Sequence, residues 1–121
     1  MNKSKWGDGP WLTEPDHLEF KHSGLSCYLH RMEMGHWCGY VAVPAGHPMH
    51  GMDYNHVNAN VHGGLTYGRG EPPLWWFGFD CAHHNDYLPG IPYGGEYWTV
   101  EMVKEETMQL ADQLSAMKGE K

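Results

Sequence analysis

The sequence is poor in cysteine and has no long apolar run. Its three cysteines (Cys27, Cys38 and Cys81) form no Cys-x-x-Cys pair, which argues against a disulfide scaffold and for a reducing compartment. No apolar run approaches the roughly 20 residues of a membrane span, and the first residues contain no apolar signal segment. We therefore expect a cytoplasmic protein without membrane contact.

Positive charge is also scarce. The chain has 8 Lys and Arg against 15 Asp and Glu, which gives a net charge of -7 with neutral histidines. So acidic a domain is a poor candidate for nonspecific binding of nucleic-acid backbones. Histidine, tryptophan and tyrosine are abundant instead, with 10, 6 and 7 copies. These residues provide groups that titrate near neutral pH and flat surfaces on which a ligand can stack.

The pattern of the 121 residues predicts a single α+β domain. An irregular arm (1–16) precedes a mainly β region with long loops (17–98), and a helix follows (99–118). A twisted antiparallel sheet of about five strands is expected, with strands at 18–22, 25–33, 36–43, 57–61 and 74–81. Residues 68–73 are expected to form only a turn or short loop. The helix is amphipathic, with one apolar stripe to pack on the sheet and Thr99 as its N-cap.

The strongest candidate site lies where the most apolar predicted strand ends, at Asp80, His83 and Asp86. A carboxylate there is costly to bury unless it is paired or bound to a metal. His62, at the end of the preceding predicted strand, would join them if the two strands form a hairpin. His62, Asp80 and His83 would then resemble a catalytic zinc site or the two-histidine, one-carboxylate triad of non-haem iron. The structural alternative is that Asp80 caps the turn and His83 is hydrogen-bonded beside it.

A second candidate site is the pair Gly63 and Gly64, which precedes Thr66. Paired glycines let backbone amides approach an anion or a ribose closely. The alternative interpretation is a β-bulge that has no ligand.

A third candidate is the long loop at 44–56, in which His47 and Tyr54 are the residues most suited to ligand contact. Trp76 shares a strand face with Asp80 in the predicted register, and its ring offers a surface for stacking a planar ligand.

Four motifs, in this order, resemble a family of small uncharacterised proteins found in bacteria and their phages. They are GYVAVPAGHP, VHGGLTY, WWFGFDCAHHND and the closing amphipathic helix, and the resemblance covers roughly residues 14–114. No established activity follows from it. It points to a set of motif residues, namely Gly46, His47, Pro48, His62, Gly63, Gly64, Thr66, Asp80, Cys81, His83 and Asp86.

The leading functional hypothesis is a non-enzymatic protein that binds a small planar or ribose-bearing ligand without a resident cofactor. In a phage setting, it would sequester a nucleotide-derived defence signal. The expected ligand contacts are His47, Tyr54, His62, Gly63, Gly64, Thr66, Trp76, Asp80, His83 and Asp86.

Two other hypotheses remain open. One is a metal-dependent hydrolase in which His62, Asp80 and His83 hold Zn or Fe and His47 or Asp86 acts as general base. The other is a direct inhibitor of a host defence protein. A site completed across a two-fold axis would also make the protein a homodimer.

Overall fold

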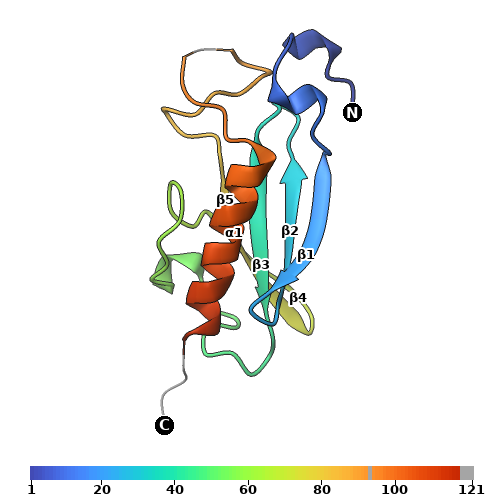
Figure 1. Cartoon of the computed structure of the whole chain (residues 1–121). Coiled ribbons are helices and arrows are strands. Elements are labelled where there is room, and N and C mark those ends of the chain that lie inside the picture. Colours follow the sequence, from blue (N-terminus) through green and yellow to red (C-terminus); the bar gives the residue numbers. More distant parts are fainter. Residues whose placement is uncertain (93, 118–121) are drawn as a thin grey trace.

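The chain folds into a five-stranded antiparallel sheet with one helix on one of its faces, in a computed structural model that describes residues 1–92 and 94–117 (Figure 1). This architecture confirms the predicted α+β fold. The strand order is β1-β2-β3-β5-β4, and every pair is antiparallel. The strands are β1 (His17–His22), β2 (Leu25–Arg31), β3 (Trp37–Val43), β4 (Tyr67–Glu71) and β5 (Leu74–Asp80), and the helix is α1 (Val100–Ser115). Three 3-10 turns complete the elements, η1 (Ser4–Trp6), η2 (Pro10–Leu12) and η3 (Tyr54–His56).

The core lies between α1 and the sheet face that it covers, which we call the inner face. Thr99 caps the helix as predicted, because its side chain accepts a hydrogen bond from the backbone N–H of Met102. The predicted apolar stripe of α1 is buried against alternate residues of β2, β3 and β5. The buried helix residues are Val100, Val103, Thr107, Leu110, Ala111 and Leu114.

The predicted strand at 57–61 is wrong, since these residues lie in the loop between β3 and β4. Val57 and Val61 are buried against the inner face, so their alternation reflects burial and not strand pairing. Side chains of α1 take the place of a neighbouring strand. Gln113 exchanges two hydrogen bonds with the backbone of Asn60, and Glu106 accepts one from the backbone N–H of His62.

The missing fourth strand is β4, at residues that the sequence predicts as a turn or short loop. The strand was predicted as a turn because it contains Gly68 and Gly70, and glycine is depleted in strands. Space favours glycine at Gly68, since a Cβ there would lie 3.3 Å from the backbone nitrogen of Tyr54.

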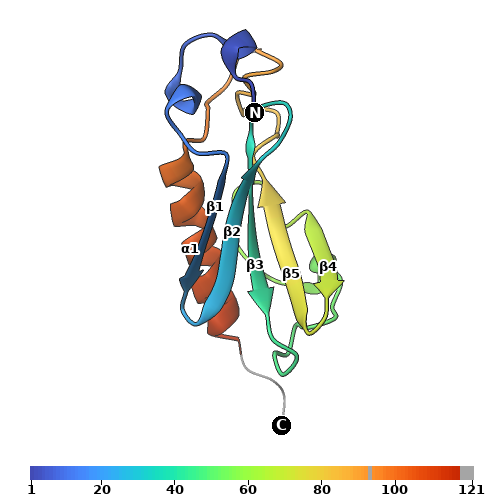
Figure 2. The same ribbon diagram turned by 90° about the vertical axis from the view of Figure 1, so that its right-hand side faces the viewer.

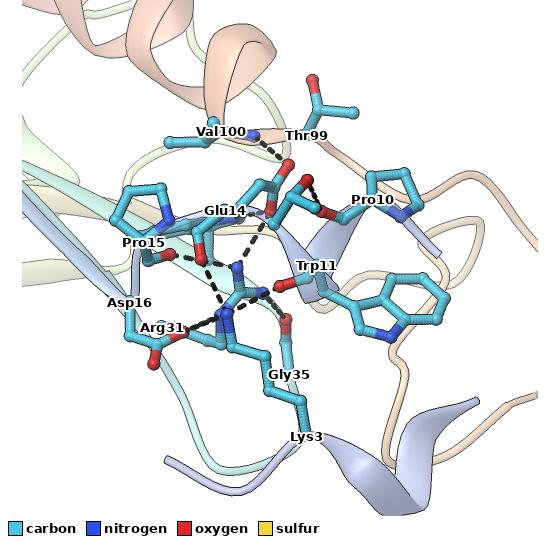
Figure 3. Close-up of polar contacts among 12 residues, drawn as sticks. Lys3, Pro10, Trp11, Glu14, Pro15, Asp16, Arg31, Gly35, Thr99 and Val100 are labelled. Atoms are coloured by element: carbon cyan, nitrogen blue, oxygen red, sulfur yellow. Dashed lines mark hydrogen bonds and ion pairs between the residues drawn. The ribbon is translucent and has the colours of Figure 1, made fainter. Parts of the chain in front are cut away.

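The N-terminal arm is fastened to the sheet by a group of polar side chains that we call the Arg31 cluster, namely Arg31, Glu14, Asp16 and Tyr97. Figure 3 shows Arg31 between Glu14 and Asp16. The fully buried Arg31 guanidinium donates to Glu14 at 2.9 Å, to Asp16 at 2.8 Å and to the Tyr97 hydroxyl at 2.9 Å. Burial alone would raise the pKa of Glu14. Hydrogen bonds from four neighbours outweigh burial and hold that pKa below its ordinary value of 4.5.

The opposite face of the sheet, which we call the open face, carries no helix in the described part of the chain. In Figure 2, α1 lies on one side of the strands only. No helix among residues 1–92 and 94–117 has the length and apolar character needed to cross a membrane.

Candidate functional site

Two histidines and an aspartate meet beside the end of β5, and we call them the His62 cluster: His62, His83 and Asp86. Nε2 of His62 lies 2.9 Å from both carboxylate oxygens of Asp86, and Nδ1 of His83 lies 3.2 Å from one of them. One ligand atom from each residue lies within 4.8 Å of the others. Asp86 is buried, with 3% of its side chain exposed, whereas the His62 and His83 side chains are 22% and 31% exposed.

Local backbone geometry brings the two histidines together. Gly63 has a φ of +70°, and a Cβ at this position would collide with the ring of His83. The turn after β5 places Asp86 back over His83, because the backbone N–H of each residue donates to the other residue. The ring of Trp98 stacks on His62 at a centroid distance of 3.9 Å and fixes the orientation of the imidazole. The cluster is thus held by glycine, turn and aromatic contacts from three parts of the chain.

Asp80 lies on the far side of His83. Its Oδ1 is 3.4 Å from Nε2 of His83, while Oδ2 accepts a hydrogen bond from the Thr66 hydroxyl and Oδ1 one from the Ala82 backbone N–H. Both ring nitrogens of His83 therefore lie beside a carboxylate, Nε2 beside Asp80 and Nδ1 beside Asp86.

The cluster differs at one member from the metal set of the hydrolase hypothesis, which was His62, Asp80 and His83. The carboxylate between the two imidazoles is Asp86, and Asp80 contacts only His83 of the cluster. The prediction relied on a hairpin between residues 57–61 and β5. His62 instead arrives from a loop against α1, on the side of the turn where Asp86 lies.

The remaining predicted residues lie apart from the His62 cluster or make no contact in it. Nε2 of His47 donates to the carbonyl of Leu114, so His47 stabilises the C-terminal turn of α1. Tyr54 packs on the core from the long loop. Gly64 has a φ of +82° and open space where a side chain would be. Trp76 is on the open face.

Sequence reasoning missed a third histidine, which lies near the cluster. His36 is half-buried, its Nδ1 has no hydrogen-bond partner among the described residues, and burial lowers its pKa. The carboxylates of Asp80 and Asp86 act in the opposite direction but more weakly. His36 therefore contributes little positive charge beside the cluster at neutral pH.

The open face carries a row of aromatic side chains that the sequence analysis also missed as a site. Tyr28 pairs with Tyr40, Tyr40 with Gly78, and Gly78 with Tyr67, so that the three tyrosines cross four strands in line. The rings of Tyr28 and Tyr40 stack at 4.5 Å, and Trp76 meets Tyr28 edge-on at 5.0 Å. A solvated face of an antiparallel sheet ordinarily has polar residues. The signal was present in the strand alternation, as aromatic residues at outward positions.

Beside this row the open face is hollowed, with a cavity of about 800 Å³. The small side chain of Ser26, paired with Lys21, leaves the space, and the rings of Tyr28 and Trp76 form its aromatic wall. Its polar rim consists of His17, Glu19, Lys21, His30 and Glu71. The cavity therefore presents flat apolar surfaces together with hydrogen-bonding groups of both charges.

The cysteines do not supply a nucleophile. All three are buried, and desolvation raises the pKa of Cys27 and of Cys38 to about 11 and raises that of Cys81 further. A thiol with a raised pKa is protonated at neutral pH and reacts poorly. Cys27 and Cys81 fill the core, and Cys38 is buried on the open face.

No protein-family model, curated protein or solved structure matches this chain. The resemblance to a bacterial and phage family stays a prediction, and the functional argument is carried by the geometry of the His62 cluster and of the open face.

Proposed function

We propose that this protein is a non-enzymatic binder that holds a small planar ligand in the cavity of the open face. The observation that carries the proposal is the cavity of about 800 Å³ walled by Tyr28 and Trp76, on a sheet face without a covering helix among the described residues. Ligand pockets are concave and mainly apolar, with a few polar groups that orient the ligand.

The charges on the rim define the class of ligand. Lys21 can contact an anionic group at one end of the cavity, while Glu19 and Glu71 can accept hydrogen bonds from ring amines or ribose hydroxyls. At the other end of β1, His17 contacts His30 and Glu19. The net charge of -7 opposes a ligand with several phosphates. A nucleoside or a nucleotide derivative of low charge fits best, and sequestering a nucleotide-derived defence signal is the biological version of this proposal.

Calorimetric titration of the purified protein tests the proposal with a panel of nucleosides, mononucleotides, cyclic nucleotides and ADP-ribose. We expect saturable binding of at least one compound. A Ser26→Trp variant, which fills the cavity, should abolish this binding and leave the unfolding midpoint within the range of ordinary surface substitutions.

The matched control is Trp6→Ala, which removes a half-exposed tryptophan in the N-terminal arm, outside the sheet. This variant should bind as the wild type does. Absence of binding across the panel, or binding that Ser26→Trp leaves unchanged, would contradict the proposal. If the protein still blocked a host defence in that case, the direct-inhibitor hypothesis would be favoured.

A further inference from the structure

The His62 cluster has the donor set and spacing of a metal centre. Two ligands bonded at about 2.1 Å to one tetrahedral or octahedral ion lie about 3.0 to 3.4 Å apart. The two imidazole nitrogens of the cluster lie 2.9 Å and 3.2 Å from the Asp86 carboxylate. All three ligand atoms lie within 4.8 Å of one another, so side-chain rotations that draw the two imidazoles together would let one ion bind all three.

We propose that His62, His83 and Asp86 form a binding site for a divalent first-row transition-metal ion, Zn²⁺ above all. Two imidazole nitrogens select such ions over Mg²⁺ and Ca²⁺, which prefer oxygen ligands. This inference is independent of ligand binding on the open face.

The surroundings of the cluster are those of a preorganised site. Trp98 stacks on His62, and the backbone N–H of His62 donates to Glu106 of α1 at 2.6 Å, so this ligand is oriented before an ion arrives. Asp80 beside Nε2 of His83 repeats the carboxylate–histidine–metal relay of many zinc sites. Thr66 and the Ala82 backbone in turn hold Asp80.

Exposure also differs between the three ligands in the way that an open metal site requires. Asp86 is buried, but the two histidine side chains are 22% and 31% exposed. Three protein ligands at a partly exposed position leave coordination sites for water or a substrate oxygen, as in catalytic zinc sites. A metal ion held in this way is the first requirement of the hydrolase hypothesis, which the site therefore keeps open.

The test is titration of chelator-treated, full-length protein with Co²⁺, followed by its visible d–d absorption, and with Zn²⁺ by calorimetry. We expect one equivalent of each ion to bind, Zn²⁺ to displace Co²⁺, and Mg²⁺ to have no effect. His62→Ala, His83→Ala and Asp86→Asn should each lose stoichiometric binding, whereas Asp80→Asn should weaken it about 10- to 100-fold.

The matched control is His84→Ala, because His84 neighbours the cluster in sequence but is exposed and outside it. Trp76→Ala on the open face should bind Co²⁺ as the wild type does, so failure of the metal site and failure of the proposed ligand site can be told apart. If a variant does not fold, the site is tested in the wild-type protein instead, by following the NMR chemical shifts of the histidine ring ¹⁵N nuclei on addition of Zn²⁺. Shifts at His62 and His83 support the site, and their absence overturns it, as does Co²⁺ binding that survives in a folded His62→Ala variant.

Discussion

The Arg31 cluster and the His62 cluster both contain a buried carboxylate, yet the partners of that carboxylate differ. In the Arg31 cluster the guanidinium is fully buried and donates to side chains and backbone carbonyls of the fold itself. In the His62 cluster the partners of Asp86 are two imidazoles whose side chains are 22% and 31% exposed. The comparison shows that burial of a carboxylate alone does not distinguish a structural ion pair from a candidate site. The chemical nature and the exposure of the residues that contact the carboxylate must also be considered.

The largest effect is expected from breaking the Arg31 cluster. Arg31→Met leaves the carboxylate of Glu14 buried without its main cation, and we expect a loss of about 3–5 kcal/mol in the free energy of unfolding. Urea unfolding measures this change. Arg69→Met, in an exposed position on β4, is the control and should change the free energy by less than about 0.5 kcal/mol. If the two substitutions had equal effects, the Arg31 cluster would not have the structural role that distinguishes it from the His62 cluster.

The next effect concerns the glycine pair beside the His62 cluster. Both residues have positive φ, so Gly64→Ala should cost about 1–2 kcal/mol of unfolding free energy. Gly63→Ala should cost about 1–3 kcal/mol more, because its Cβ collides with the His83 ring while position 64 is open.

Urea unfolding and Co²⁺ titration of the two glycine variants check this prediction together. Only Gly63→Ala should weaken Co²⁺ binding, by at least about 10-fold, since only this variant displaces a proposed ligand. If both variants bound Co²⁺ equally well, the close contact with His83 would have no part in forming the site.

A smaller effect is expected on ligand binding at the open face, and it tests whether this face and the His62 cluster are independent sites. Trp76→Ala removes one wall of the cavity, and loss of a stacking surface should weaken binding of the planar ligand by about 1–3 kcal/mol, roughly 5- to 150-fold. Calorimetry with the bound compound from the panel measures the change. His62→Ala should leave that affinity unaltered, and a similar loss in both variants would indicate one continuous site.

The smallest effect is the acid dependence of the Arg31 cluster. The pKa of Glu14 and that of Asp16 are both lowered in the folded protein, because hydrogen bonds and cations outweigh burial. Their stabilisation is complete above the ordinary carboxyl pKa and is lost as the pH falls through the folded values, since the unfolded chain takes up protons first. The urea concentration at the unfolding midpoint should therefore decrease once the pH is lowered below about 4.5. Glu14→Gln should flatten this decline, and an unchanged decline would assign it to other carboxylates.

Much of the fold could be predicted because each correct element has its own local signal. The stripe of α1 and its Thr99 cap follow helical spacing, β2 alternates between apolar and polar residues, and β3 and β5 are short apolar runs typical of buried strands. The prediction failed where a local signal has two physical causes. The alternation at 57–61 arises from burial of Val57 and Val61 in the core and not from strand pairing. Glycine occurs at position 68 of β4 because the backbone of Tyr54 lies close to it.

The candidate site was predicted in part for the same reason. His62, His83 and Asp86 stand out in the sequence as polar residues next to apolar segments, and all three were named as candidates. Their mutual arrangement depends on a loop whose backbone is satisfied by helix side chains far along the chain. No pattern within a few residues contains that information.

The sequence by itself determined the α+β class, the apolar face of the helix, the burial of the cysteines and the abundance of aromatic and histidine side chains. Those properties follow from the residue composition and from the spacing of apolar residues within each segment. Only the tertiary structure decided that Asp86 and not Asp80 joins the two histidines, that His47 stabilises the end of α1, and that the outward aromatics form one row beside a cavity. These results depend on register and on loop placement, and both are fixed by contacts between residues distant in the chain.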